Sequence, residues 1–356
     1  MITTKEQDVN SKKKDKKVIK CVVWDLDNTL WQGVLLEDEK VSLHKNIVNI
    51  IHTLDSRGIL QSIASKNEHT TATAKLEEFG LKEYFLYPQI NWNSKANSLK
   101  EISNSLNIGL DAIAFVDDQL FELEEVKFSL PEILCLNADE VGHILDMPVM
   151  NPRFITEDSR IRRLMYISDI ERKSAEKEFV GTADEFLATL NMNFTISGAK
   201  EEDLQRAEEL TVRTNQLNTT GYTYSYDELN DFRQSENHKL LVASLEDKYG
   251  SYGKIGLALI ECQPKSWIIK LLLMSCRVMS RGVGTIMMNH IMSLAQSNNV
   301  RLLAEFVPNN RNRMMYISYK FAGFKEIDNN DDSVIFENDL TRIQDPPSYV
   351  NFQVID

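Results

Sequence analysis

An apolar run that ends abruptly in two aspartates constrains this chain more than any other feature of its sequence. Residues 22–24 read Val-Val-Trp, Asp25 follows directly, and Asp27 comes two positions later in Asp-Leu-Asp-Asn-Thr. Side chains alternate between the faces of a strand, so both carboxylates can point the same way where the strand opens into a loop. Two adjacent carboxylates repel each other, which is useful if they bind a cation, or if one is a nucleophile and the other an acid/base group. The structural alternative is an Asp/Asn turn.

Residues 18 to about 150 alternate strand-like and helix-like segments. The pattern predicts strands at Val18–Asp27, Ile59–Ser65, Ala112–Asp118 and Ile133–Leu136, and helices near His44–Arg57, His69–Phe79, Lys95–Leu106 and Leu120–Lys127. This alternation predicts an α/β fold with a doubly wound parallel sheet, in which ligands bind at the carboxyl ends of the strands. The segment Gln32–Leu43 is too short for an inserted cap domain. We therefore expect an uncapped site that admits a bulky or protein-bound substrate.

A second α/β domain is expected after the boundary marked by Pro148 and Pro152. A charged helical segment, Glu157–Phe179, comes first, and the second block starts near Gly181. Its expected elements are strands Met192–Ile196, Leu240–Glu246, Gly253–Cys262, Ser266–Met274 and Arg301–Phe306, helices Glu201–Arg213 and Gly284–Ser297, and a last helix and strand. The predicted parts are a tail (1–17), a first domain (18–150), a helical linker (151–180), a second domain (181–340) and a C-terminal tail (341–356).

Composition limits the partners and the compartment. The 356 residues carry a net charge of −13, which argues against binding to nucleic acid, while residues 1–17 are lysine-rich and predict a disordered tail. We see no secretory signal and no stretch near the ~20 apolar residues that span a bilayer. The four cysteines show no metal-type spacing, so neither a zinc site nor a disulfide framework is expected. A cytoplasmic, reduced protein without membrane contact fits these features.

Three further segments belong with Asp25 and Asp27, and in this order they resemble motifs I to IV of the haloacid dehalogenase (HAD) superfamily. Ser-Lys-Asn (65–67) closes the second predicted strand, Lys95 begins a helix, and Asp-Asp (117–118) closes the third strand. The resemblance implies that Asp25 attacks phosphorus, that Asp27 moves the proton, and that Lys95 offsets negative charge. The residues implied to contact the phosphoryl group are Ser65, Lys66, Asn67 and Lys95. Those implied to hold Mg²⁺ are Asp25, Asp27 through its main-chain carbonyl, Asp117 and Asp118.

Each of these segments also has a structural interpretation. Ser65 can be a helix N-cap and Lys95 a solvated helix residue, and the paired aspartates can form a turn at the end of a strand. The ordered occurrence of all the segments at the ends of strands favours the functional interpretation.

A cysteine beside a glycine-containing turn marks a second candidate site. The predicted strand Ser266–Met274 leads to Cys276, and Arg277 and Arg281 precede an apolar helix. Backbone N–H groups and the helix dipole make a helix N-terminus an anion site, and together with the arginines they would stabilise a thiolate. The turn resembles the acyl-CoA-binding turn of GNAT N-acyltransferases, although Ile286 stands where that motif has a small residue. The alternative is a cysteine that only packs as a small apolar side chain.

Four segments together resemble the FkbH-like family, a HAD subfamily IIIC group in which a HAD half is joined to a GNAT-like half. They are residues 22–35, 115–122, 213–220 and 274–283. The resemblance implies a glyceryl transferase/phosphatase that takes 1,3-bisphosphoglycerate, holds the glyceryl unit as a thioester, removes phosphate, and loads a separate acyl carrier protein for polyketide or related biosynthesis. Cys276 would then be the acyl acceptor. Residues of a Thr-Asn loop would line the acyl site, unless they only form a turn: Asn215, Asn218 and Thr219.

Three hypotheses stay open on the sequence alone. The first is the bifunctional enzyme just described, the second is a plain Mg²⁺-dependent phosphatase with a GNAT-like binding module, and the third is a non-catalytic scaffold. The complete set of polar residues at the first site argues against the scaffold. Carrier proteins are typically acidic, as is this chain, so docking would need a local basic patch. The candidates, on what is otherwise a solvated helix face, are Arg160, Arg162, Arg163 and Arg172.

Overall fold

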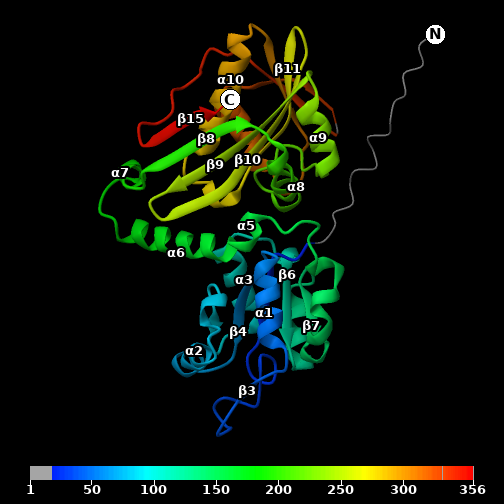
Figure 1. Ribbon diagram of the computed structural model, residues 1–356, viewed down its shortest axis with the longest axis vertical. Coiled ribbons are helices and arrows are strands. Elements are labelled where there is room, and N and C mark those ends of the chain that lie inside the picture. Colours follow the sequence, from blue (N-terminus) through cyan, green and yellow to red (C-terminus); the bar gives the residue numbers. More distant parts are fainter. Residues whose placement is uncertain (1–17, 331, 356) are drawn as a thin grey trace, which may run out of the picture. The chain divides into compact units, whose positions relative to one another are not determined.

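The computed structural model describes residues 18–330 and 332–355, so the predicted lysine-rich tail (1–17) lies outside the described residues. The described chain forms two compact units, 18–168 and 169–355 (Figure 1). The boundary falls inside helix α6 (Arg162–Glu178), whereas the sequence analysis assigned residues 151–180 to a separate linker. We call the two parts the first unit and the second unit, and describe each by itself.

The first unit is built on a five-stranded sheet in the order β5-β4-β1-β6-β7, and all neighbouring strands are parallel. The strands are β1 (Cys21–Trp24), β4 (Leu60–Ser65), β5 (Gln89–Ile90), β6 (Ile113–Asp117) and β7 (Leu134–Asn137). The helices are α1 (Ile47–Ser56), α2 (His69–Glu78), α3 (Lys95–Leu106), α4 (Leu120–Ser129) and α5 (Glu157–Arg160), with short 3-10 turns at Lys82–Tyr84, Leu110–Ala112, Ala138–Asp146 and Pro148–Met150.

Helices cover both faces of this sheet because its strands are apolar on both faces. Val22 and Trp24 of β1 belong to the buried cluster that includes Ile50 and Leu54 of α1. Helices α3 and α4 pack against β4 and β6, and the intervening residue Val23 is fully buried as well. A run of residues buried on alternate faces is typical of a parallel strand between two layers of helices.

Between β1 and α1 the chain forms only a two-stranded hairpin, β2 (Trp31–Gln32) and β3 (Ser42–Leu43). Gly33 in this hairpin has a φ of +96°, and a Cβ at that position would lie 2.7 Å from a carboxylate oxygen of Asp38. Glycine is therefore the residue that fits this turn. The hairpin confirms that no cap domain is inserted at this point of the chain.

The second unit is built on an eight-stranded mixed sheet in the order β13-β14-β12-β11-β10-β9-β8-β15. The strands are β8 (Met192–Gly198), β9 (His238–Asp247), β10 (Gly250–Cys262), β11 (Ser266–Met274), β12 (Arg301–Phe306), β13 (Lys325–Asn329), β14 (Val334–Asn338) and β15 (Val350–Ile355). The helices are α6, α7 (Ala183–Ala188), α8 (Leu204–Arg213), α9 (Tyr226–Gln234), α10 (Val283–Ser297) and α11 (Arg313–Phe321), with 3-10 turns at Glu201–Asp203 and Cys276–Val278.

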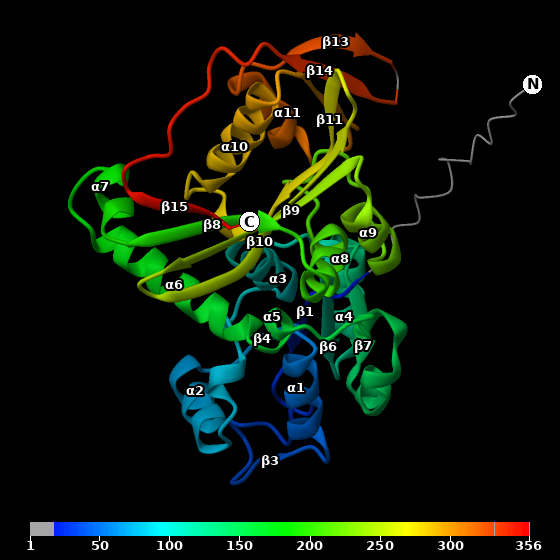
Figure 2. The ribbon, with the colours of Figure 1, turned by 45° about the horizontal axis from the view of Figure 1, so that its top comes forward.

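Two buried clusters hold this sheet between its helices. One cluster joins α10 and α11 to one face, and the other joins α8 and α9 to the opposite face (Figure 2). Strand β9 shows the alternation clearly, because Leu241 and Ala243 belong to the α10 cluster and Leu240 and Val242 to the α9 cluster. The period of two residues expected for a strand therefore decides which helix each side chain meets.

A segment of the chain fills the wedge where the parallel strands β11 and β12 separate. The two strands pair only as far as Ile269 and Ala304. Beyond that point Thr219 donates its backbone N–H to Leu272 (3.0 Å) and accepts from Val307 through its carbonyl (3.0 Å). Residues 217–219 thus replace part of the missing strand pairing and supply partners to backbone groups of both strands' ends.

Two predictions about surface segments differ from the structure. Residues 341–356 were expected to form a tail, but β15 pairs in parallel with β8 from Val350 to Ile355. The other difference concerns the arginines proposed as a basic patch or a solvated helix face, since Arg162 and Arg172 are only 4% and 1% exposed.

Each of these arginines has a partner inside its own unit. Arg162 donates to the carbonyl of Gly58 (3.1 Å), and Arg172 forms a buried ion pair that is described below. Of the four, Arg160 is exposed. The helix pattern in the sequence could not show this, because the partners lie far away along the chain. Among the described residues no helix is both long and apolar enough to cross a membrane.

Candidate active site

The polar residues predicted for phosphoryl transfer meet at the carboxyl ends of the parallel strands. Asp25 follows β1, Ser65 ends β4, and Asp117 ends β6, so three adjacent strands present their last residues at one edge. Lys95 is the first residue of α3 and follows the N-cap Ser94. This is the edge at which ligands bind in open α/β sheets.

Lys95 is the cation at the centre of this cluster. Its ammonium contacts Asp25, lies 3.0 Å from Oδ2 of Asp117, and donates to the carbonyl of Ala64 (2.8 Å). The side chain is only 4% exposed. Burial alone would lower the pKa of Lys95, but the two carboxylates outweigh burial and raise it. Lys95 is therefore a fixed positive charge beside the carboxylate that would attack phosphorus.

Three carboxylates form a group that fits a hard divalent cation. Oxygens of Asp25, Asp117 and Asp118 all lie within 4.8 Å of one another. Burial, with a contribution from Asp25, raises the pKa of Asp117 to about 6 and also raises the pKa of Asp118. Oδ1 of Asp118 is buried and has no hydrogen-bond partner among the described residues. A buried acceptor without a donor is costly, and Mg²⁺ prefers such oxygens, so the group fits this ion.

Asp27 is held by a separate set of donors. Its Oδ1 accepts from the indole N–H of Trp31 (2.8 Å) and the backbone N–H of Leu35 (3.1 Å), and its Oδ2 accepts from Asn67 (2.9 Å). Burial raises the pKa of Asp27, while the bonds from Trp31 and Leu35 lower it. A carboxylate with a raised pKa in a fixed orientation is suited to giving and taking a proton.

The residues around the central cluster have different environments. Ser65 is buried at the end of β4, beside this cluster. Lys66 forms an ion pair with the buried Glu122 of α4. Thr29 accepts a hydrogen bond from the backbone N–H of Asp118 (3.1 Å), which ties the loop after β1 to the loop after β6.

Three of these residues are not among the site residues predicted from the sequence. Thr29 and Trp31 lie in the first motif, and Glu122 lies on α4. Trp31 was detectable in principle, since a tryptophan four residues after an aspartate can reach its carboxylate when the loop turns back. Glu122 gave no such signal, because its partner Lys66 is 56 positions away.

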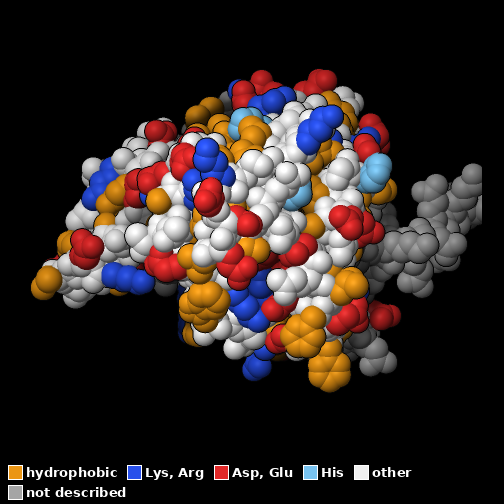
Figure 3. Space-filling model, turned by 90° about the horizontal axis from the view of Figure 1, so that it is seen from below, with side chains coloured by type: hydrophobic (Ala, Val, Ile, Leu, Met, Phe, Trp, Pro, Cys, Tyr) orange, Lys and Arg blue, Asp and Glu red, His pale blue; other side chains and the backbone are white. Residues whose placement is uncertain are grey.

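Apolar side chains are exposed on the same unit, near the ends of the strands. Trp92, which precedes α3, is 69% exposed, and Leu120 and Phe121 at the start of α4 are 67% and 74% exposed. Figure 3 views the structure from the side on which the β2–β3 hairpin lies, and it shows large apolar side chains beside basic ones. An uncapped site with an apolar rim agrees with the expectation of a bulky substrate.

Replacing Trp31 with Phe tests the role of the indole N–H. The ring packing is largely kept and one hydrogen bond to Asp27 is lost, so we expect turnover of a phosphate monoester to fall about tenfold. The lost bond would raise the pKa of Asp27. Because Asp27 must be protonated to donate to a leaving oxygen and ionised to take a proton from water, both limbs of the pH profile of kcat should move to higher pH.

The matched control is Trp24→Phe. Trp24 is also buried, but its indole N–H bonds to Gln61 (3.2 Å) and not to Asp27. The pH profile of this variant should match that of the wild type. Equal pH profiles for both variants and the wild type would show that Trp31 does not orient Asp27.

The second candidate site lies at the end of β11 in the second unit. Cys276 begins a 3-10 turn and is partly exposed. The neighbouring Arg277 donates to the backbone carbonyl of Tyr252 (2.8 Å). Helix α10 follows, with Gly282 as its N-cap at a φ of +75°. A Cβ on Gly282 would lie 3.0 Å from the hydroxyl of Tyr349, so this hydroxyl lies close to the helix N-terminus at which an anion site was expected.

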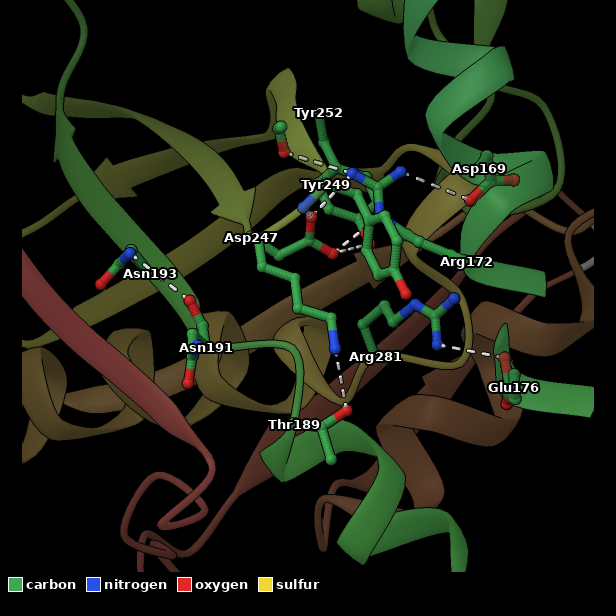
Figure 4. Close-up of polar contacts among 12 residues, drawn as sticks. Asp169, Arg172, Glu176, Thr189, Asn191, Asn193, Asp247, Tyr249, Tyr252 and Arg281 are labelled. Atoms are coloured by element: carbon green, nitrogen blue, oxygen red, sulfur yellow. Dashed lines mark hydrogen bonds and ion pairs between the residues drawn. The ribbon is translucent and has the colours of Figure 1, made fainter. Parts of the chain in front are cut away.

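Arg281 is part of a buried charged network near this turn (Figure 4). It is 2% exposed and pairs with Glu176 (3.4 Å), and its Nε has no hydrogen-bond partner among the described residues. Arg172 and Asp247 form a two-bond ion pair (2.7 and 2.8 Å), and the hydroxyl of Tyr252 donates to the same carboxylate (2.9 Å). Burial raises the pKa of Tyr252, so it stays a neutral donor. The network fixes the carbonyl that holds Arg277.

The Thr-Asn loop lies beside the same strand end. Met274 donates its backbone N–H to the carbonyl of Leu217 (2.9 Å), two residues before Cys276. Asn218 and Thr219 are fully buried in the wedge described above, where the Thr219 hydroxyl accepts from Leu272 (3.0 Å). Their hydrogen bonds hold the strands, whereas Asn215 is partly exposed. The structure thus brings the loop to the cysteine and gives two of its three predicted residues a structural role.

Comparison with known proteins gives three similar structures of interest. The N-terminal part of BF1531 from Bacteroides fragilis, containing a phosphatase domain complexed with Mg, is 28% identical, with a TM-score of 0.34 over 38% of this chain and 41% of that chain. The ribosomal-protein-S18-alanine N-acetyltransferase from Escherichia coli is 16% identical, with a TM-score of 0.33, and the match covers 44% of this chain and 97% of that chain. The 3-deoxy-D-manno-octulosonate 8-phosphate phosphatase from Moraxella catarrhalis is 20% identical, with a TM-score of 0.27, and the match covers 32% of this chain and 65% of that chain.

No protein-family model matches the chain, and a search of the curated proteins finds no match. The fold class is confirmed by the strand topology. The chain is α/β, with an uncapped parallel sheet wound on both faces, followed by a second α/β unit on a mixed sheet.

Proposed function

We propose that this chain combines a Mg²⁺-dependent HAD-type phosphatase with a GNAT-like acyltransferase. The observation that carries the proposal is the buried cluster of Asp25, Lys95 and Asp117 at the carboxyl ends of adjacent parallel strands. A nucleophile, a fixed positive charge and metal ligands are the components that phosphoryl transfer needs. When bound there, Mg²⁺ would neutralise charge on the phosphoryl oxygens.

The chemistry of the first unit follows from its own side chains. A carboxylate oxygen of Asp25 attacks phosphorus, and the bond from phosphorus to the leaving oxygen breaks. Asp27 donates its proton to that oxygen, then takes a proton from a water molecule that attacks the aspartyl phosphate. Inorganic phosphate leaves and the Asp25 carboxylate is restored. Ser65 and Lys95 hold the phosphoryl oxygens during both steps.

The resemblance to the FkbH-like family supports a finer proposal for the substrate. The thiolate of Cys276 would attack the acyl carbon of 1,3-bisphosphoglycerate, forming a C–S bond while the C–O bond to phosphate breaks. The remaining phosphate ester would be hydrolysed at Asp25. A thiol on a separate acyl carrier protein would then attack the thioester and release Cys276. A cytoplasmic metabolite as substrate fits the expected cytoplasmic location.

Intact-protein mass spectrometry tests the acyl-transfer half. The protein is incubated with enzymatically generated 1,3-bisphosphoglycerate and Mg²⁺, as wild type, Cys276→Ala and Asp25→Asn. We expect a glyceryl adduct on the wild type, no adduct on Cys276→Ala, and a phosphoglyceryl adduct that persists on Asp25→Asn. The matched control is Cys262→Ala, since Cys262 is also a partly buried thiol, and it should keep the adduct.

Absence of any adduct on the wild type, with phosphatase activity in the same tube, would contradict the thioester step. A plain phosphatase with a GNAT-like binding module would then be the better account. An adduct that survives Cys276→Ala would also contradict the thioester step, because acylation would then not depend on this cysteine.

A further inference from the structure

A groove of about 340 Å³ lies at the end of strand β8 in the second unit. Strand β8 ends at Gly198, opposite Leu241 of β9, so residues 238–240 of β9 pair with β10 on one side but have no β8 partner on the other. The volume is in the range of small-molecule sites. None of the residues proposed for phosphoryl or acyl transfer lines the groove. Its walls are formed by Ile196, Ser197, Gly198, Ala199, Arg233, His238, Lys239, Leu240, Leu241, His290, Leu294, Val354 and Ile355.

Every ionisable side chain among these described lining residues is basic. They are Arg233 from α9, His238 and Lys239 from the start of β9, and His290 from α10. The chain as a whole carries a charge of −13, so the absence of acidic side chains from the residues that line this groove distinguishes it from the protein as a whole. Low-dielectric walls lined by charges of one sign focus the field and attract a ligand of opposite charge.

The basic groups keep hydrogen-bonding capacity for a ligand. Arg233 bonds to Asn230 through Nε and Nη2 (3.1 and 2.7 Å), and the acidic group that faces it is Glu201, 3.7 Å away and 72% exposed. Nδ1 of His238 bonds to the hydroxyl of Ser235 (2.8 Å), which leaves Nε2 for a partner.

The other two basic groups contact aromatic rings. The Lys239 ammonium lies 5.5 Å from the ring of Trp267. The ring of His290 packs edge-on against Phe352 (5.9 Å between ring centres), and burial lowers its pKa. Neither group has an acidic partner among the described residues.

The floor and the remaining walls of the groove are open and apolar. A Cβ on Gly198 would meet nothing within 4 Å, and the φ of this glycine lies outside the range that only glycine adopts readily. Leucine, isoleucine and valine side chains form the rest of the wall, and Val354 and Ile355 of β15 are 48% and 49% exposed.

We propose that this groove binds a small amphipathic anion. A carboxylate, phosphate or sulfonate head would lie at the end of β8, where Arg233 and His238 border the groove on the α9 side and Lys239 and His290 border it on the α10 side, and an apolar body would cover the exposed side chains of β15. The site is separate from both proposed reactions, so it stands whether or not they are correct.

The test uses 1-anilinonaphthalene-8-sulfonate as the anionic probe and N-phenyl-1-naphthylamine as its uncharged counterpart. The whole chain has six histidines, so ring signals can be followed by NMR and assigned with His238→Gln and His290→Gln. We expect the anionic probe to shift the signals of His238 and His290, and to bind at least tenfold more tightly than the uncharged probe.

Two variants decide whether binding occurs in the groove. Gly198→Val adds a side chain to the open floor without backbone strain and should weaken the anionic probe at least tenfold. Gly142→Val is the matched control in the first unit, because a Cβ there also meets nothing within 4 Å, and its affinity should be unchanged. Lys239→Met removes one charge and should weaken only the anionic probe.

Three results would overturn the proposal. They are unshifted His238 and His290 signals, equal affinity for the two probes, and wild-type affinity of Gly198→Val for the anionic probe.

Discussion

Replacing Asp25 with Asn should lower phosphatase turnover by about 10⁴-fold or more, and added Mg²⁺ should not restore it. An amide is not a nucleophile toward phosphorus, and loss of a covalent nucleophile is among the most severe single changes in enzymes. The change also removes a charge that contacts the buried Lys95. The measurement is kcat for para-nitrophenyl phosphate as a function of Mg²⁺ concentration.

Asp118→Asn is the matched variant for this prediction. Its carboxylate belongs to the same group of three oxygens but is not the proposed nucleophile. We expect a higher Mg²⁺ requirement, with most of kcat recovered at saturating Mg²⁺. If excess Mg²⁺ rescued Asp25→Asn as well, Asp25 would be a metal ligand only and the nucleophile would have to be sought elsewhere.

Replacing Arg172 with Met should destabilise the second unit by about 3–5 kcal/mol. The side chains of Arg172 and Asp247 are 1% and 0% exposed, and Arg172 also lies over the ring of Tyr252 (3.9 Å). Removing one partner leaves the Asp247 carboxylate buried without its counter-charge, which costs about this much in other buried pairs. Hydrogen exchange of peptides covering β9 and β10 should become roughly 10² to 4 × 10³ times faster, since about 1.4 kcal/mol corresponds to a factor of ten.

Arg301→Met provides a control with the same bond geometry on the surface. Arg301 also makes two bonds to one carboxylate, that of Glu337 (2.7 and 3.1 Å), but its side chain is 61% exposed. Exposed pairs are screened by water and contribute little, so hydrogen exchange should not change measurably. Equal exchange rates for the two variants would show that burial does not set the strength of the Arg172–Asp247 pair.

The strands and helices that form the two cores were predictable because the apolar residues of each segment recur with the period of either a strand or a helix. The predicted helix Lys95–Leu106 and strand Ser266–Met274 have the observed bounds. Strand β15 was not predicted, because only Val350 of its six residues is buried and an edge strand needs only one partner. Helix α9 was also not predicted, since its one buried side chain is Leu229.

The candidate site likewise contains residues that the sequence could place and residues that it could not. Asp25, Ser65 and Asp117 end buried strands, and parallel strands bring their ends together, so sequence order was enough to place them at one edge. The donors to Asp27 were not predicted as a set, since Asn67 is 40 positions away and Leu35 contributes only its backbone.

The wedge in the second unit shows the same limit. No local pattern indicates that Thr219 would pair with β11 across more than 50 positions of chain. Long-range hydrogen bonds of this kind depend on the completed sheet, and a periodic pattern in one segment carries no information about them.

Borohydride trapping of the phosphoenzyme tests the central claim most directly. The wild-type protein is quenched in acid while it turns over para-nitrophenyl phosphate with Mg²⁺, then treated with borohydride, which reduces an aspartyl phosphate to homoserine. Peptide mass spectrometry reads the residue at position 25. The account predicts homoserine at position 25 in the quenched, active enzyme and aspartate without substrate. Unmodified Asp25 in enzyme that is turning over, with homoserine at another aspartate, would contradict it.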